Sequence, residues 1–311
     1  MKIKIIGSAA GGGFPQWNCN APLSRAVRSN WTGYLPRKQS SIAASVDDQN
    51  WVVFNASPDI RQQIADTPEL HPREDGSLRN TPIAAVVLTN ADVDHIAGLL
   101  SLRERQQFIL YGTDRVLKTL EENSIFQVLN SEVVERRELP HRGICEVQGP
   151  GGATGITIET FPVPGKVALF LEDENAEGGN FGTQEGDTIG VRISERNGGA
   201  NLFYIPGCAR IDGDLKTRLM NAECLLFDGT VFVDTEMQDT GVGEKTGGRM
   251  GHMAISGPQG TLAALSDVDI ARRIFVHINN TNPILEPGSE AERQVLAAGW
   301  EIGYDGMEVH L

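Results

Sequence analysis

The chain has few cysteines and no long apolar run, and each shortage excludes a class of protein. Cys19, Cys145, Cys208 and Cys224 are widely separated and form no C-x-x-C pair. This usage fits reduced thiols in a reducing compartment better than a disulfide framework. No stretch reaches the roughly 18 apolar residues of a membrane span, and the first residues lack a signal-peptide pattern. We therefore expect a cytoplasmic protein without membrane insertion.

Positive charge is also scarce. The chain carries 27 Lys and Arg against 41 Asp and Glu, giving a net charge of −14 and a pI of about 4.9. Binding to a phosphate backbone requires a basic face, so nucleic acid is not an expected partner. With 311 residues and 40% hydrophobic content, the chain can bury a large core in one large domain or two fused halves.

Short apolar runs, several ending in polar residues, predict strands along the whole chain. They are Lys2–Ile6, Ser41–Ser45, Trp51–Asn55, Pro82–Leu88, Gly155–Phe161, Thr188–Ser194, Leu202–Ile205, Cys224–Phe227, Ile274–Ile278 and Met307–Leu311. Helices are predicted at Val116–Asn123 and after Ser289, which forms a capping box with Glu292. The run Gly7 to Gly13 follows the first strand but lacks the spacing of a nucleotide-binding loop. We expect its glycines to adopt positive φ and pass close to a ligand.

The second half of the chain repeats the pattern of the first. The two halves, about 1–165 and 188–311, are joined by the acidic, Gly-rich segment Glu172–Asp187, which we interpret as a surface loop or lid. Two mixed β-sheets packed face to face, with helices outside each, would bury all the apolar runs. The predicted fold class is α/β (α+β), a single αββα sandwich domain.

The stretch Val86 to Gly98 predicts a metal site. A buried strand ending near Thr89 is followed by Asp92, Asp94 and His95, and such strand ends carry the chemistry of α/β sheets. Imidazole and carboxylate ligands suit Zn, Fe or Mn, and a mixed set with open positions is typical of non-haem Fe(II) oxygenases. The alternative interpretation is that His95 is a loop histidine and that Asp94 caps the following helix.

Three more polar residues could reach the same cleft: Asp228, His252 and His277. Alone, Asp228 could be a turn residue and His277 a core histidine. The following Asn279 to Asn282 could orient His277 or simply form a turn into Pro283. His71, His141 and His310 have no such neighbours, and we assign them structural roles.

The segment Thr89-Asn90-Ala91-Asp92-Val93-Asp94-His95 resembles the H-x-H-x-D-H signature of the metallo-β-lactamase superfamily, with Asn90 and Asp92 replacing the first two histidines. The resemblance implies that Asp94, His95 and His277 match one metal site and that Asp228 matches the bridging aspartate. Asn90 makes a dinuclear zinc hydrolase the disfavoured interpretation.

Longer blocks are similar to the coenzyme PQQ synthesis protein B family of that superfamily. They are Gly7 to Asn20, Asn55 to Arg61, Gly98 to Glu104 and His277 to Leu285. The resemblance implies a cytosolic step in making pyrroloquinoline quinone (PQQ) from a precursor whose Glu and Tyr side chains are cross-linked. The favoured function is an iron-dependent hydroxylase that oxygenates the tyrosine ring. The alternative is a carrier of PQQ or its precursor that assists transport to the periplasm.

For the hydroxylase, the resemblance implies Fe(II) held by Asp94, His95 and His277, with Asp92 or Asp228 completing or supporting the shell and Zn²⁺ as the alternative metal. His252 is the expected acid/base residue, with Asp92 as a second candidate catalytic residue, and an unliganded structural role for His252 is the alternative. Candidate clamps for the substrate carboxylates are Arg249, Lys245, Arg61 and Arg103. Expected partners are the cross-linked precursor or PQQ, O₂, other PQQ biosynthesis proteins and a second copy of the chain.

Many members of this family carry a C-x-C-x-x-C zinc knuckle beginning at the position of Cys19. Here Ala21 and Ser24 occupy the other two positions. One thiolate cannot complete a tetrahedral zinc site, so we predict no structural zinc there. We expect Phe14, Trp17 and Trp31 to hold this loop by packing.

Overall fold

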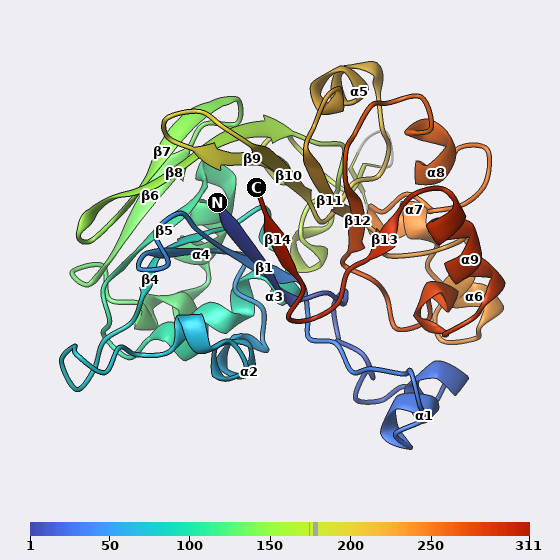
Figure 1. The fold of residues 1–311 in the computed structure, drawn as a ribbon, viewed down its shortest axis with the longest axis horizontal. Coiled ribbons are helices and arrows are strands. Elements are labelled where there is room, and N and C mark those ends of the chain that lie inside the picture. The colour runs from blue at the N-terminus through green and yellow to red at the C-terminus, as the bar shows by residue number, and fades with distance from the viewer. Residues whose placement is uncertain (174, 177–179) are drawn as a thin grey trace.

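The computed structural model describes residues 1–173, 175–176 and 180–311. Residues 174 and 177–179, which belong to the predicted Glu172–Asp187 loop, lie outside the described residues. Figure 1 shows two sheets with helices flanking them, and a short arm bearing α1 that projects from the body.

The described chain forms two seven-stranded sheets. The first has the order β14-β1-β2-β3-β4-β5-β6, from strands Glu308–His310, Lys2–Gly7, Ser41–Ser45, Trp51–Phe54, Ile83–Val87, Phe108–Thr113 and Val134–Leu139. The second has the order β13-β12-β11-β10-β9-β8-β7, from strands Glu301–Ile302, Arg273–Val276, Cys224–Asp228, Asn201–Ile205, Ile189–Glu195, Gly152–Pro162 and Gly143–Gly149.

Both sheets are mixed in the same way. Strands β3 to β6 are parallel in the first sheet, and β10 to β13 are parallel in the second, while the remaining neighbours pair antiparallel. Parallel strands bring their carboxyl ends to one edge, which is where ligands bind in such sheets. The topology therefore places the loops after β4, β10, β11 and β12 together.

Helices such as α4 and α9 cover the outer faces of the sheets, whereas α1 lies on the projecting arm. The α-helices are Pro22–Arg28 (α1), Ile60–Ala65 (α2), Val93–Ile96 (α3), Asp114–Glu122 (α4), Gly213–Leu219 (α5), Glu236–Asp239 (α6), Gly247–Met250 (α7), Thr261–Ala264 (α8) and Glu290–Ala297 (α9). The 3₁₀ turns are Pro68–Leu70 (η1), Ala97–Leu102 (η2), Ser124–Val128 (η3), Leu169–Leu171 (η4) and Pro283–Leu285 (η6).

Alternating side chains explain this layering. Ile3 and Ile5 of β1 enter a core between the sheets, which they share with Leu226 of β11. On the outer faces, Leu120 of α4 packs on the first sheet and Val295 of α9 packs on the second. Since a strand presents alternate residues to opposite faces, each sheet buries apolar residues on both sides. The predicted αββα sandwich is confirmed.

The predicted elements are present, with ends that differ by a few residues. Helix α4 begins at Asp114, earlier than predicted, because Thr113 Oγ1 caps it by accepting a hydrogen bond from Val116 N. The prediction missed β5, β6, β7 and β13; β6 reads Val-Glu-Arg-Arg-Glu-Leu, which carries no long apolar run. The sheets also differ from the predicted halves in composition, since β7 and β8 belong to the second sheet and β14 to the first.

The prediction for the loop around Cys19 is wrong in part. Phe14 is buried, but Trp17 and Trp31 are 86% and 60% exposed. Arg28 instead holds the loop, with its guanidinium donating to the carbonyl oxygens of Gln16 and Cys19. Charged hydrogen bonds to backbone therefore replace the expected aromatic packing.

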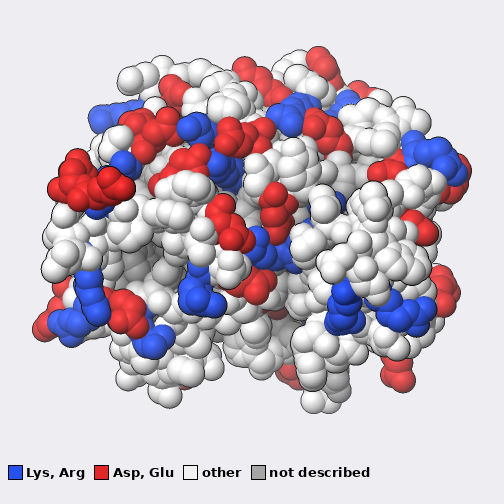
Figure 2. Space-filling view, turned by 60° about the horizontal axis from the view of Figure 1, so that its bottom comes forward, with Lys and Arg blue, Asp and Glu red and all other residues white. Residues whose placement is uncertain are grey.

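On the face shown in Figure 2, acidic and basic side chains are interspersed, and they form no continuous basic patch there. No helix among the described residues is long and apolar enough to cross a bilayer.

Candidate metal centre

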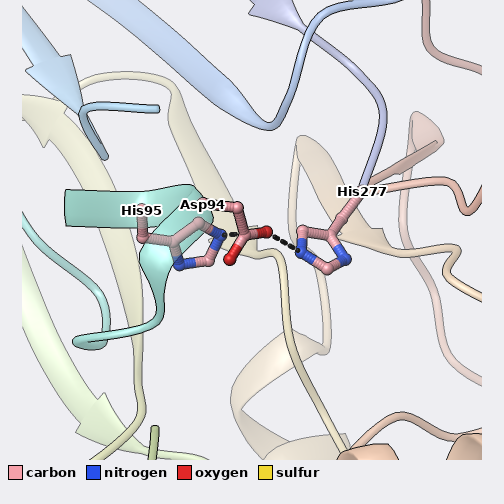
Figure 3. Close-up of side chains that lie close together, drawn as sticks. All are labelled: Asp94, His95 and His277. Atoms are coloured by element: carbon pink, nitrogen blue, oxygen red, sulfur yellow. Dashed lines mark hydrogen bonds and ion pairs between the residues drawn. The ribbon is translucent and has the colours of Figure 1, made fainter. Parts of the chain in front are cut away.

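The predicted ligands come together at the carboxyl ends of parallel strands. Asp94 and His95 lie on α3, which follows β4, whereas Asp228 ends β11 and His277 follows β12. Figure 3 shows the Asp94 carboxylate between the imidazoles of His95 and His277. Residues distant in sequence and belonging to different sheets thus converge on one point.

The spacing of Asp94, His95 and His277 suits one metal ion. The Asp94 Oδ2 atom lies 3.1 Å from His277 Nε2 and 3.9 Å from His95 Nε2. Two nitrogen or oxygen ligands at about 2.0–2.1 Å from a tetrahedral ion lie about 3.3 Å apart. One ligand atom from each residue lies within 4.8 Å of the others.

Asn90 fixes the orientation of His95. The Asn90 Oδ1 atom accepts from Asp92 N at 3.0 Å and lies 2.6 Å from His95 Nδ1. An amide oxygen can only accept hydrogen bonds, so the His95 Nδ1 atom that faces it carries a proton. The Nε2 atom of His95 is then unprotonated, and its lone pair points to the cluster. Within the described chain, this buried Nε2 atom has no hydrogen-bond partner. A buried lone pair that lacks a donor is the environment expected of a metal ligand.

Thr230 orients His277 in a comparable way. Its hydroxyl lies 2.6 Å from Asp228 Oδ1, to which it donates, and 2.8 Å from His277 Nδ1, from which it then accepts. The His277 Nε2 lone pair is thereby directed at Asp94 Oδ2. Two acceptors 3.1 Å apart need a proton or a cation between them. The residues therefore fit a divalent ion, which would take the place of that proton.

The pKa shifts follow from this arrangement. Burial opposes ionisation of Asp94, yet His95 and His277 hold the pKa of its carboxyl well below the usual range. Burial also opposes protonation of His277, but Asp94 raises its pKa above the ordinary value. For His95, burial lowers the pKa to about 4, so its imidazole is neutral and able to ligate at neutral pH.

Asp228 and His252 form a second pair beside this cluster. His252 Nδ1 donates to Asp228 Oδ2 at 2.6 Å, and the same oxygen accepts from Cys208 N at 2.8 Å. The His252 and His277 rings stack with centroids 5.0 Å apart. Asp228, His252 and His277 also have ligand atoms within 4.8 Å of one another. Asp228 thus orients the His252 ring, in addition to its predicted role as a metal ligand.

Asp92 lies beside the cluster but outside both groups of mutually close ligand atoms. Its Oδ1 atom accepts from Leu169 N of η4 at 3.2 Å. Burial, and next the Asp94 charge, raise the pKa of Asp92 to about 6. The position of Asp92 fits a carboxylate that supports or completes the set of metal ligands.

The candidate substrate-binding residues lie in different places. Arg249 of α7 pairs with Glu172, with Nη2 and Oε2 at 2.7 Å, and its guanidinium lies over the Phe181 ring. Lys245 precedes α7 and is half-buried. Arg61 and Arg103 are exposed, and in the described chain neither has a hydrogen bond or ion pair with a cluster residue. Of these four candidates, Arg249 is the nearest to His252 in the sequence, three residues before it.

Sequence reasoning missed Thr230 and Lys166 and gave Asn90 no role in orienting His95. The sequence signal for this role of Asn90 was its position just after the end of the predicted strand, one residue after Thr89. The predicted positive φ is confirmed at Gly12 and Gly13, with values of 93° and 70°, and a Cβ atom at Gly11 would lie 3.5 Å from Asp94 Oδ2.

The asparagine-rich turn after His277 is tied to the same centre. Asn282 Nδ2 donates to Gly229 O at 2.9 Å, and Asn279 N donates to Thr230 O at 3.0 Å. These bonds hold the turn against the segment that carries Asp228 and Thr230. They support the interpretation that the turn positions His277, whose φ is +56°.

The three histidines assigned structural roles have local partners. His71 Nε2 lies 3.0 Å from Ala65 O, His141 Nε2 lies 2.7 Å from Asp114 Oδ1, and His310 Nε2 lies 3.1 Å from Glu308 Oε2. None of these partners belongs to the metal centre, so these histidines offer control positions.

Comparison with known proteins places this geometry in context. A β-lactamase superfamily domain model matches residues 50–278. Coenzyme PQQ synthesis protein B of Methylobacterium nodulans is 51% identical over 311 residues, covering the whole of both chains. The corresponding protein of Methylobacterium radiotolerans is 49% identical, again over the whole of both chains.

Solved structures agree with the fold. The Zn²⁺-bound PqqB from Methylobacterium extorquens matches with a TM-score of 0.93 and 47% identity over the full length of both chains. A diphosphatase from the PhnP family matches with a TM-score of 0.66 and 17% identity, covering 100% of this chain and 97% of its own. At that identity the second similarity shows the fold alone.

Proposed function

The chain belongs to the coenzyme PQQ synthesis protein B family of the β-lactamase superfamily, and we propose that it is an iron-dependent hydroxylase of PQQ biosynthesis. Its substrate would be the cross-linked Glu-Tyr precursor, oxygenated on the tyrosine ring. The observation that carries the proposal is the buried, unpartnered His95 Nε2 atom facing Asp94 and His277. These three residues form a compact ligand set that leaves other positions of an ion open.

Asp94, His95 and His277 would hold the metal, with Asp92 and Asp228 as supporting carboxylates. Family membership and the ligand set support a divalent metal, and the M. extorquens relative binds Zn²⁺. We propose Fe(II) because a hydroxylase that activates O₂ at a metal needs a redox-active ion, and a His/carboxylate set with open positions suits non-haem iron. When bound, iron would supply activation of O₂.

The residues of the chain would handle the proton. Because His252 donates from Nδ1 to Asp228, its Nε2 atom is left to accept the proton that leaves the ring carbon. In the balanced reaction, one oxygen atom of O₂ replaces the ring hydrogen. The other leaves as water, taking two protons and two electrons from an external reductant. Asp228, which is fully buried, would stabilise the protonated imidazole.

The test is turnover with defined metal. Purified protein is loaded with Fe(II) without oxygen, given a cross-linked Glu-Tyr diamino-acid substrate and a reductant, and then exposed to O₂. We expect a product heavier by one oxygen atom, absent with Zn²⁺ alone and lost in His95→Ala. His310→Ala is the matched control because His310 is exposed and its imidazole lies 3.1 Å from Glu308, which is not a residue of the metal centre.

The outcome that contradicts the hydroxylase is tight PQQ binding without turnover under any metal, which would favour the carrier. Asn90→His tests the hydrolase interpretation. Peptide or ester hydrolysis gained with Zn²⁺ in this variant would revive it.

A further inference from the structure

A carboxylate of the chain itself is held between two cations beside the metal centre. The Glu172 side chain, 7% exposed, receives Lys166 Nζ on Oε1 and Arg249 Nη2 on Oε2, the second at 2.7 Å. Lys166 follows β8 and Arg249 lies on α7, so the two cations come from separate segments. Two cations that each engage one oxygen form a typical carboxylate-binding arrangement.

The segments that carry these two cations adjoin the metal centre. A Cβ atom at Gly251, the neighbour of His252, would lie 2.9 Å from the Lys166 Cβ atom. On the other side, Leu169 of the same segment as Lys166 donates to Asp92. The clamp is therefore built on segments that adjoin His252 and contact Asp92.

The same cations line a cavity of about 470 Å³. Lys166, Phe181, Thr188, Arg249 and Gly251 are among its lining residues. The Arg249 guanidinium lies 3.7 Å from the centroid of the Phe181 ring, which fixes the plane of the guanidinium. A cavity with cations and an aromatic ring suits an aromatic ligand that bears carboxylates.

We propose that Lys166 and Arg249 form a carboxylate clamp for the substrate, and that Glu172 occupies this clamp until a ligand carboxylate displaces it. The proposal rests on the proposed function, because it takes the ligand to be a carboxylate-bearing precursor of PQQ. Exchange of one carboxylate for another leaves the charge of the clamp region unchanged. Both cations thus remain paired in the free and the liganded protein, which avoids the cost of unpaired charges in a cavity.

A tethered carboxylate competes with any ligand. Through its connection to the chain, Glu172 acts at an effective concentration in about the millimolar range. Ligands with a single carboxylate would therefore be excluded, whereas a ligand with several carboxylates and an aromatic ring gains further contacts. Glu172 would select for polycarboxylates by this competition.

The experiment measures binding in the full chain by calorimetry, with and without bound Zn²⁺. The probe is PQQ, which bears three carboxylates, and its trimethyl ester is the comparison ligand. We expect Glu172→Gln to bind PQQ about 10-fold more tightly, and Lys166→Met and Arg249→Met to bind it at least about 10-fold more weakly. Affinity for the trimethyl ester should change less than about twofold in every variant.

Glu135→Gln is the matched control, because Glu135 is an exposed acid that pairs with Arg137 and is not among the residues lining the cavity. It should bind PQQ like the unaltered chain. Unchanged or weaker binding in Glu172→Gln would overturn the proposal and assign Glu172 to holding the loop. Failure of PQQ to bind at all would overturn it too. This experiment measures binding and not turnover. Its result therefore does not depend on whether the hydroxylase assay succeeds.

Discussion

The two sides of the metal centre differ in how completely their polar atoms are paired. On the side that belongs to the first sheet, His95 Nε2 is buried without a hydrogen-bond partner among described residues, and the pKa of Asp92 is raised. On the side of the second sheet, both Asp228 oxygens accept hydrogen bonds, from Thr230, Cys208 and His252. The first side thus presents an unpaired imidazole nitrogen, whereas on the second side the paired Asp228 orients His252 directly and His277 through Thr230.

This difference separates two tasks. Unpaired lone pairs provide affinity for a cation, because a buried acceptor gains most from a new partner. A paired carboxylate and imidazole provide orientation and proton transfer instead. We therefore expect substitutions on the two sides to have different signatures.

The largest effect is expected from His95→Ala, which removes a proposed metal ligand. Metal affinity should fall by at least about 100-fold, because the loss of a ligand exceeds the 10- to 100-fold effect of losing its hydrogen-bond partner. Metal content after dialysis and calorimetric titration measure this. His71→Ala, which removes a histidine bonded to Ala65 O, should retain full metal content. Full retention in His95→Ala as well would disprove the assignment of the ligand.

Asn90→Ala is expected to have the next largest effect. The ring of His95 would lose the acceptor that fixes its tautomer, and metal affinity should fall about 10- to 100-fold. Affinity measured by competition with a chelator checks this. Asn90→Asp keeps the acceptor oxygen and should restore binding. An unaltered affinity in Asn90→Ala would mean that His95 is oriented by other contacts.

Asp92→Asn and Asp228→Asn should change the stability of the metal-free protein in opposite directions. An unfolded aspartate loses its proton near pH 4, whereas folded Asp92 retains its proton up to about pH 6. Between these values the folded state binds more protons, so the free energy of unfolding falls as pH rises. At pH 7 Asp92→Asn should thus stabilise by up to about 2 kcal/mol, with no gain below about pH 4.

Asp228→Asn should instead destabilise at pH 7 by about 1–3 kcal/mol, since it replaces one acceptor oxygen with a donor that faces buried donors. Here the folded pKa is lowered, because the attraction of His252 outweighs the effect of burial. The stabilisation by Asp228 is present above the unfolded pKa and is lost as pH falls through the folded value. Denaturant unfolding at several pH values measures both variants. Shifts of the same sign would remove the proposed distinction.

The smallest effects are expected from Arg61→Ala and Arg103→Ala, which lie on neither side of the centre. Both side chains are exposed, and stability should change by less than about 0.5 kcal/mol and substrate KM by less than about twofold. Steady-state kinetics and thermal unfolding check this. A large rise in KM for either variant would restore that arginine as a substrate clamp.

The sequence allowed much of the fold and the ligand set to be predicted because both depend on local patterns. Apolar runs such as Cys224–Phe227 mark buried strands, and parallel strands bring Asp94, His95 and His277 to a shared edge. Strand β6 was not predicted because its residues are mostly polar. Its pairing with β5 is set by tertiary contacts, which the local pattern does not show.

The side-chain partners could not be predicted in the same way. The bond from His95 to Asn90 depends on the geometry of one turn, and the meeting of Lys166 with Glu172 depends on the path of an irregular segment. The sequence predicts that Trp17 and Trp31 pack in the loop around Cys19, yet both are exposed. Nothing in the sequence shows which loop residues face solvent. Contacts made by loops therefore need the structure.

The metal centre joins the two sheets, and bound metal would therefore affect the stability and abundance of the protein in the cell. Asp94 and His277 are 183 residues apart in the chain, so their ligand atoms meet only when both sheets have docked. An ion bound by both favours the native state by mass action, in proportion to the logarithm of its free concentration over its Kd. A shortage of metal would then reduce the amount of protein that survives proteolysis, and not only the activity of each molecule. The metal supply of the cell and the abundance of the protein would thus be coupled through one shared edge of the sandwich.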